Sequence, residues 1–353
     1  MTAKDQQLLK IWLMTGYVLV LVMVALGGIT RLTGSGLSIV RWDVVTGVLP
    51  PLNEEAWEQA FADYQHTPQF KQINRDFTLN DFKGIYWWEY IHRLVGRITG
   101  LVFIIPFVAF HISGRVPLWL LRRLWLILGL AIAQGIMGWV MVMSGLQNLP
   151  YVSHYRLAMH LGLALYLSFV IWQTYLSVDH NEPARRSSPW LLRVTISLLV
   201  IQIVLGAFVA GVKAGFYYNT FPLMGDRLIP ENIFVSFENG VTLQFLHRWF
   251  AFVVAGAVFL VWWKFRNDNR HEIRTGSYVL LGLTLLQMTL GIITLVNAVP
   301  ISFAVAHQLT AFLLTAALTY VNFYVTRPMA MSARVESSLQ SSSENTRISN
   351  SAS

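Results

Sequence analysis

Long apolar stretches separated by short polar segments dominate the pattern of hydrophobic and polar positions along the chain. Each stretch approaches or exceeds the roughly 20 residues that an α-helix needs to cross the hydrocarbon core of a bilayer. The pattern therefore predicts an all-α membrane protein with eight transmembrane helices. In chain order they are expected over residues 8–28, 90–110, 119–142, 155–175, 190–210, 241–263, 278–296 and 301–320.

The composition agrees with this pattern. Of the 353 residues, 55% are hydrophobic and only 12% are charged, more apolar surface than a soluble domain of this size buries. The first apolar stretch is too long for a cleavable signal peptide and has no small-residue cleavage site before Arg31. Because the chain has no cysteine, disulfides, iron–sulfur clusters and thiolate zinc sites are excluded.

The distribution of positive charge predicts the orientation. With the amino terminus inside, the inner segments hold fifteen of the 26 Lys and Arg residues although most of these segments are short. By the positive-inside rule both termini are expected in the cytoplasm. The net charge of +8 is then explained by topology and by contact with anionic membrane lipid, and it does not indicate nucleic-acid binding.

Three polar segments carry their own predictions. Segment 27–38 (GGITRLTGSGLS) has four glycines in ten residues, which predicts that the first helix ends there and that another group approaches its backbone closely. Segment 53–81 has apolar residues at helical spacing, so we expect short amphipathic helices that lie on the membrane or cap the bundle. The serine-rich tail 331–353 is expected to be disordered and cytoplasmic.

A charged motif, EYIHRLVGR (89–97), stands at the start of the second apolar stretch. Charged groups within a membrane are costly and mostly functional. Glu89 and His92 are three residues apart and share one face of a helix, in its first turns as expected from the hydropathy. The motif returns as QFLHRWF (244–250), with Gln244 in place of the carboxylate.

Further matches indicate an internal repeat. QGIMG (134–138) in the third stretch corresponds to QMTLG (287–291) in the seventh, and AMH (158–160) corresponds to AHQ (306–308). Each half has an even number of spans, so both run in the same direction across the membrane. We therefore expect two parallel-repeat four-helix bundles, over residues 1–180 and 181–330.

Four histidines fall in the outer third of the even-numbered spans, and hence at one depth: His92, His160, His247 and His307. Two imidazoles that project from different helices into a bundle core are the arrangement that holds a haem iron from both sides. A lone histidine is more often a packing residue, but four at matched positions of a repeat favour iron ligation. His66, His111, His180 and His271 are expected outside the site, and His154 is at most a neighbour of it.

Arginines accompany these histidines. Arg93, Arg97 and Arg248 either reach toward lipid headgroups or bind haem propionates, since the guanidinium fork suits carboxylates. Arg31 and Arg41 are further candidates. The sequence leaves both interpretations open.

These motifs together closely resemble the haem A synthase family over about residues 8–325, most specifically in segment 27–38 and in Glu-x-x-His-Arg. The family oxidises the C8 methyl group of haem O to a formyl group, which gives the haem A of terminal cytochrome oxidases. The resemblance implies a substrate haem site with Glu89, His92 and His160, and a haem b site with His247 and His307. Some members carry a cysteine pair in the first outer loop, and any step that uses it cannot operate in this chain.

The resemblance also implies partners and a location. These are a haem O-producing membrane enzyme, cytochrome oxidase assembly factors, an unidentified electron donor or acceptor, and the bacterial inner (plasma) membrane. Glu89 is then the expected catalytic acid–base group, because a chemical site needs an ionisable residue that an electron-transfer site can lack. The alternative role of Glu89 is stabilisation of the helix dipole from the first turn.

Two other classes remain as alternatives. A non-catalytic di-haem b electron carrier would have equivalent halves, and a transporter would carry polar groups at mid-membrane and no haem. The oxygen source is also open. With both His92 and His160 on the substrate iron, either one histidine leaves or the macrocycle is oxidised and attacked by water.

Overall fold

The structure is a computed structural model that describes residues 1–41, 48–147, 150–180, 188–231, 233 and 235–327. In these ranges the secondary structure is helical, and eight helices are long and apolar enough to cross a membrane. The predicted fold class and number of spans are thereby confirmed. The eight are α1 (Ala3–Leu32), α4 (Leu79–Ser113), α5 (Leu118–Gln147), α6 (His154–Ser177), α7 (Trp190–Gly211), α8 (Gly240–Phe265), α9 (His271–Val296) and α10 (Ile301–Val325).

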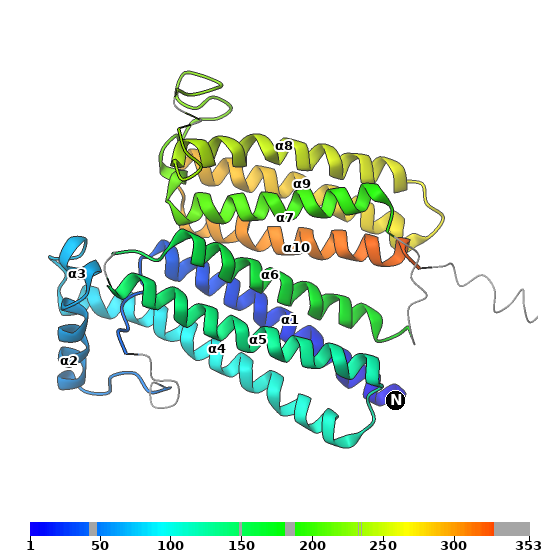
Figure 1. Ribbon diagram of the computed structural model, residues 1–353, viewed down its shortest axis with the longest axis horizontal. Helices are drawn as coiled ribbons and strands as arrows, with labels where there is room; N and C mark the ends of the chain where they lie inside the picture. Colours follow the sequence, from blue (N-terminus) through cyan, green and yellow to red (C-terminus); the bar gives the residue numbers. More distant parts are fainter. Residues whose placement is uncertain (42–47, 148–149, 181–187, 232, 234, 328–353) are drawn as a thin grey trace, which may run out of the picture.

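The spanning helices form two groups that lie side by side (Figure 1). Helices α1, α4, α5 and α6 contact one another in the first group, and α7, α8, α9 and α10 do so in the second. Helices α1 and α6 meet α10 and α7 where the groups join, and Trp172 Nε1 donates to the carbonyl of Ala316 there at 3.0 Å. This arrangement is compatible with two four-helix units. The junction 181–187 and the tail 331–353 lie outside the described residues.

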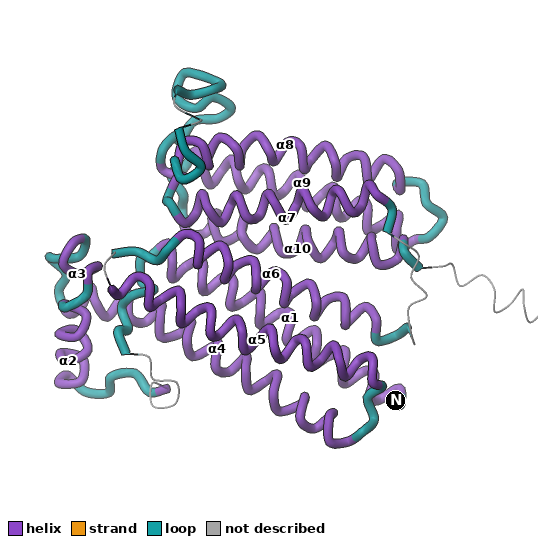
Figure 2. The backbone as a smooth tube through the Cα atoms, in the orientation of Figure 1, coloured by secondary structure: helices purple, strands orange, loops and turns teal. Residues whose placement is uncertain are grey.

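Each group has its own apolar core. Leu13, Leu120 and Ile127 are among the buried residues of the first core, and Leu192, Val258 and Val321 belong to the second. The loops gather at the two ends of the molecule, and the amino terminus lies at the same end as the close of α10 (Figures 1 and 2). Both ends of the described chain are therefore on one side of the membrane.

A small cap covers one end of the first group. It consists of α2 (Glu54–Gln65) and α3 (Pro68–Gln72), begun by the side chains of Asn53 and Thr67 that accept hydrogen bonds from helix N–H groups. Aromatic side chains join the cap to α4, among them Trp57, Tyr64 and Phe82. The expected short helices that cap the bundle are present. We call this end the outer end.

Helix α1 runs through Gly27 and Gly28 and ends only after Leu32, where Gly34 adopts a φ of +70°. The expected end of the helix at the first glycines is therefore wrong. Its physical reason is that these glycines permit close packing inside a helix: a Cβ atom on Gly28 would lie 2.9 Å from Oε1 of Gln308. The predicted close approach is real, but side chains of other helices make it.

Helix α4 begins at Leu79, well before the apolar stretch expected from residue 90. Thr78 and Asp81 form a capping box that starts it. Its 35 residues correspond to about 52 Å, against roughly 30 Å of hydrocarbon. Helix α4 therefore continues beyond the bilayer into the cap, and hydropathy missed this part because its buried side packs on α2 rather than on lipid.

Candidate functional site

The motif that contains Glu89 lies well inside α4, almost three turns after the helix begins. The interpretation of Glu89 as a first-turn partner of the helix dipole is therefore wrong. Its side chain is buried, with 2% exposure, at the level where the cap meets the bundle. A carboxylate so buried must be held by hydrogen bonds or by an opposite charge.

Glu89 and Arg93 together hold the end of the glycine-rich segment. Oε2 of Glu89 accepts hydrogen bonds from the backbone N–H and hydroxyl of Ser38, both at 2.7 Å, and from the N–H of Ile39 at 2.9 Å. Oε1 of Glu89 pairs with Arg93 Nη2 at 2.6 Å. Arg93 also donates to the carbonyl oxygens of Ile39 and Arg41, at 2.9 and 3.1 Å. We call these two side chains the first clamp.

Gln244 and Arg248 form the corresponding second clamp on α8. Gln244 Nε2 donates to the carbonyl of Tyr218 at 3.0 Å. Arg248 donates to the same carbonyl at 2.5 Å and to those of Thr220 and Leu223, at 2.9 and 3.2 Å. Both clamps fix an outer loop, but Glu89 accepts from backbone N–H groups whereas Gln244 donates to a carbonyl. The two side chains are therefore not equivalent in hydrogen bonding, although they occupy matching positions.

The second helix group brings His247 and His307 together. Their ring centroids are 6.3 Å apart and their planes are inclined at 86°. Two imidazoles bonded to one metal ion from opposite sides, each at about 2.0–2.1 Å, place their ring centres roughly 6 Å apart. The spacing of the two rings fits an iron held between them.

In the first group, His92 and His160 lie near each other. His92 faces Gly27 of α1, where an added Cβ would lie 3.5 Å from Nε2, and His160 faces Gly138 of α5, where the distance to Cε1 would be 3.3 Å. Nδ1 of His160 is buried without a hydrogen-bond partner. An orphaned ring nitrogen on an imidazole of such a pair also fits a site completed by a metal centre.

Three glutamines that the sequence did not single out as site residues contact these histidines. Gln134 and Gln287 were noticed only as markers of the repeat, and Gln202 on α7 was missed. Each amide nitrogen lies within 3.4 Å of a histidine ring nitrogen: Gln134 of His160, Gln202 of His247 and Gln287 of His307. The signal that could have found them is the spacing Gln-x-x-x-Gly, which occurs in α5, α7 and α9.

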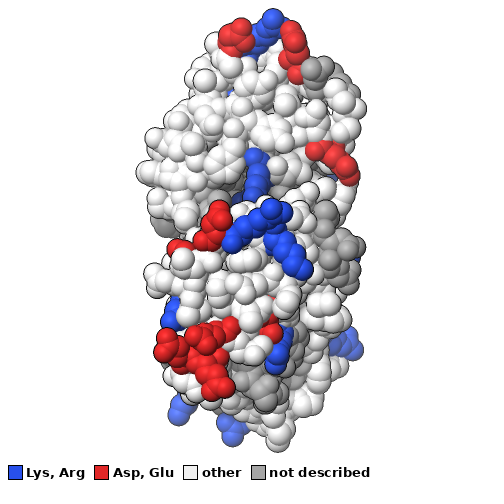
Figure 3. Space-filling model, turned by 90° about the vertical axis from the view of Figure 1, so that its left-hand side faces the viewer, with Lys and Arg blue, Asp and Glu red and all other residues white. Residues whose placement is uncertain are grey.

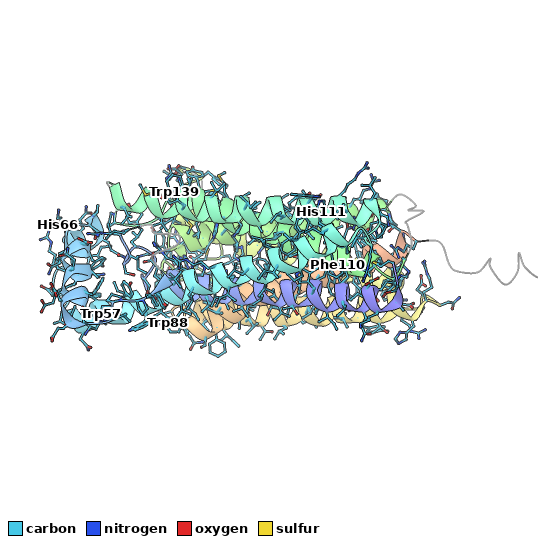
Figure 4. All side chains as sticks on the ribbon, turned by 90° about the horizontal axis from the view of Figure 1, so that it is seen from below. Trp57, His66, Trp88, Phe110, His111 and Trp139 are labelled. Carbon is cyan, nitrogen blue, oxygen red and sulfur yellow. The ribbon has the colours of Figure 1, made fainter. Side chains whose placement is uncertain are left out.

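The other candidate arginines and histidines belong to neither clamp and to neither histidine pair. Arg97 is partly buried on α4, one turn beyond Arg93, whereas Arg41 forms an ion pair with Asp63 of the cap at 3.0 Å. Figure 4 shows His66 on the cap and His111 toward the opposite end of the molecule. The ring of His154 lies 4.2 Å from that of Tyr155 between centroids, tilted by 39°, and His154 belongs to neither pair.

Charge is spread unevenly over the outer end (Figure 3). Acidic side chains gather in the lower part of that view, where the cap lies, and α2 carries Glu54 and Glu55 in its first turn. Arg and Lys side chains occupy the middle of the same face. The outer end is thus polar and charged.

The fold and the site define a polytopic helical membrane protein in which two histidines from each helix group lie near each other. The chain belongs to the family described as cytochrome oxidase assembly protein, whose model matches residues 10–319.

Proteins named heme A synthase are similar to the chain over almost its whole length. The one from Flavobacterium psychrophilum is 42% identical over 90% of this chain and 98% of its own length. The one from Nitrosomonas eutropha is 42% identical over 89% and 92%, and the one from Orientia tsutsugamushi strain Boryong is 40% identical over 91% and 97%. The resemblance read from the motifs is confirmed.

Proposed function

We propose that this chain is a haem A synthase, an integral membrane oxidoreductase that converts the C8 methyl group of haem O into the formyl group of haem A for cytochrome oxidase. The observation that carries the proposal is the presence of two histidine pairs at matching places of a chain 42% identical to proteins of that name. The clamps support it further, because the ionisable Glu89 stands near the histidine pair of the first half, whereas the second half has the neutral Gln244 at the matching position.

We assign the resident haem b to the second half, residues 181–330, with His247 and His307 as its iron ligands. The spacing of their rings supports this assignment. Arg248 is the proposed propionate partner in this half, because its Nε is buried without a hydrogen-bond partner and can donate to a carboxylate. When bound, the haem supplies a redox centre that can pass electrons between the substrate site and an external donor or acceptor.

The first half, residues 1–180, is the proposed substrate site, where His92 and His160 hold haem O. Arg93 and Arg97 are the proposed propionate partners there, since they lie on the same helix as His92, within five residues of it. The conversion of a methyl to a formyl group takes two successive oxidations and the loss of water from a hydrated aldehyde.

Glu89 is the proposed acid–base group of this reaction. Its Oε2 accepts a hydrogen bond from the Ser38 hydroxyl, so this pair can hold or release a proton one turn from His92. The same carboxylate accepts hydrogen bonds from Ser38 and Ile39 and so fixes the end of the glycine-rich segment. A proton role and an anchoring role are therefore combined in one side chain.

The orientation and partners complete the proposal. The amino and carboxyl termini are cytoplasmic, the histidines lie near the outer surface of a bacterial inner membrane, and a haem O-producing membrane enzyme delivers the substrate. The amino terminus and the end of α10 lie at the same end of the molecule, which supports this topology. The basic residues of the inner segments indicate that this end faces the cytoplasm.

The test is production of haem A in a bacterial membrane that contains haem O but lacks its own haem A-forming enzyme. Expression of this chain should make haem A appear in haem extracts separated by chromatography. The matched control is His92→Ala, which should insert and leave haem O unconverted. Bound haem in the purified protein without any haem A would instead favour the di-haem electron carrier.

A further inference from the structure

Four helices present a glycine to one of the four histidines, each near the outer end. On Gly206 and Gly291 an added Cβ would lie 2.9 Å from Cε1 of His247 and of His307. Together with Gly27 and Gly138, these glycines leave room for imidazoles that press against a neighbouring helix. In α5, α7 and α9 a glutamine stands four residues before the glycine and so lies on the same helix face, one turn deeper.

The amide group of each of the three glutamines lies within hydrogen-bond distance of its histidine. Gln202 Nε2 lies 2.9 Å from the carbonyl oxygen of His247 and 3.1 Å from its Nδ1. Gln134 Nε2 lies 3.2 Å from the carbonyl of His160 and 3.4 Å from its Nε2.

Gln287 approaches its histidine in two ways. Its amide lies 3.4 Å from Nε2 of His307, and His307 Nδ1 lies 3.1 Å from the backbone carbonyl of Gln287. In each of the three glutamines the Oε1 atom is buried and has no hydrogen-bond partner. In Gln134 and Gln202 such an oxygen, with the amide turned over, can accept the N–H of the near ring nitrogen once the other ring nitrogen binds a metal. In His307 the backbone carbonyl of Gln287 is the acceptor for Nδ1–H, so Nε2 is the nitrogen left for the metal.

Helix α1 departs from this arrangement at one position. Its sequence is MVALG (23–27), so Met23 stands where the other three helices have glutamine. The Met23 methyl group packs 3.4 Å from the place of a Cβ on Gly96, one turn beyond His92. A thioether donates no hydrogen bond. In the part of the chain that the structure describes, no hydrogen bond reaches the His92 ring.

We propose that Gln134, Gln202 and Gln287 are positioning residues that orient their histidines toward haem iron, and that Met23 leaves His92 as the exchangeable ligand. This inference rests on the proposed function, because it takes the histidine pairs to be haem ligands. Hydrogen-bonded partners fix the ring orientation of a ligating histidine and raise its basicity, and their loss typically costs about 10–100-fold in metal affinity. His92 thus binds iron about 10–100-fold more weakly than its three counterparts.

The asymmetry suits the two sites that it separates. A resident haem in the second half is held by two oriented imidazoles, His247 and His307. In the first half only His160 has an amide partner, so the substrate haem can enter and its product can leave by exchange at His92. If one histidine leaves the iron during the oxidation, the structure assigns that role to His92 rather than to His160.

The test measures the access of carbon monoxide to ferrous haem in the full-length purified protein, loaded by titration with haemin. In the unchanged protein the first-half haem should bind carbon monoxide and the second-half haem should not. Met23→Gln adds the missing amide with a side chain of similar length. It should lower the carbon monoxide affinity of the first-half haem about 10–100-fold. Met23→Leu, apolar like methionine, should leave that affinity unchanged.

The reciprocal variant is Gln202→Met, which should make the second-half haem reactive toward carbon monoxide while haem remains bound. An unchanged affinity in Met23→Gln, or an inert second-half haem in Gln202→Met, would overturn the inference. Both results are read from absorption spectra and need no haem A formation. Failure of the proposed function looks different, because haem would then stay fully bound when His247 and His307 are replaced by alanine.

Discussion

In the proposed function, the two halves of this protein use one helical scaffold for two tasks, and the surroundings of their histidines differ at two places that bear on this division. The first clamp contains a buried carboxylate, Glu89, where the second has the neutral Gln244. Among the described residues, no amide contacts the ring of His92 as Gln202 contacts that of His247. If the proposed roles hold, the comparison teaches that a repeat can keep its helices and its histidines while the surroundings of one site alone become suited to chemistry and to ligand exchange.

The largest difference between the halves is expected from removal of the histidines themselves. His247→Ala should remove the resident haem b, because it deletes an iron ligand. The loss in haem affinity should exceed the about 10–100-fold that follows when only a hydrogen-bond partner of a ligand is removed. His92→Ala should keep haem b and abolish haem A formation. Absorption spectra of the purified variants check both. Equal loss of haem b in the two variants would contradict the division of labour.

The carboxylate of the first clamp comes next. Glu89→Gln should lower haem A formation about 10²–10⁴-fold, which is the usual contribution of an acid–base group. Because Glu89 also accepts three hydrogen bonds from Ser38 and Ile39, part of this loss can come from a loosened segment. Ser38→Ala removes only the hydroxyl and serves as the control. Haem A and haem O in cell extracts provide the measurement, and near-normal haem A in Glu89→Gln would leave Glu89 as an anchor alone.

The arginines of the clamps should differ in their contribution to stability. Arg93→Ala leaves Glu89 as a buried carboxylate without its ion pair, and such a break costs about 3–5 kcal/mol. Arg248→Ala removes hydrogen bonds to three carbonyls that are partly solvated, at a cost of about 1 kcal/mol. Thermal denaturation in detergent should therefore show a larger shift for the first variant. A larger shift in the denaturation midpoint for Arg248→Ala would mean that the clamps do not stabilise the outer loops as described.

A smaller effect is expected from the glycines that face the histidines. Gly206→Ala places a Cβ 2.9 Å from His247. The resulting overpacking costs about 1–3 kcal/mol, which corresponds to about 5–150-fold in haem b affinity if it falls on the haem-bound state. Gly256→Ala on α8 is the matched control, because an added Cβ there meets no atom within 4 Å. Titration with haemin measures both affinities. Indistinguishable values would show that the ring of His247 has room to move.

Hydropathy was enough to predict the eight spans, because long apolar stretches are a strong local signal. It misplaced the start of α4 and the end of α1, since hydropathy records neither helix caps nor partners that are distant in sequence. The capping box of Thr78 and Asp81 starts α4, and the close approach of Gln308 lets α1 continue through Gly28.

The contacts around the site were beyond the sequence for a related reason. The roles of Gln202 and Met23 follow from which face of a helix meets which histidine, and no single segment contains that information. The anchoring role of Glu89 likewise depends on Ser38, which lies 51 residues earlier. Matching a repeat one helix face at a time would have revealed the three glutamines and the single methionine.

The first clamp also bears on how the chain enters the membrane. In the proposed orientation, the outer ends of α4 and α8 are translocated against an inside-negative membrane potential. Arg93 can make this passage as a neutral pair with Glu89, whereas Arg248 has only a neutral amide as its clamp partner. One elementary charge that crosses the full potential costs about 2.3 kcal/mol per 100 mV.

Biogenesis of the second half should consequently depend more on the energised state of the cell than that of the first. Gln244→Glu should reduce this dependence. Protease accessibility of the two outer loops, with and without an uncoupler of the membrane potential, measures it. Equal sensitivity of Gln244→Glu and the unchanged protein would show that the clamp charge plays no part in insertion. A side chain that we described as an anchor and an acid–base group would thus also act earlier, as a counter-charge during synthesis.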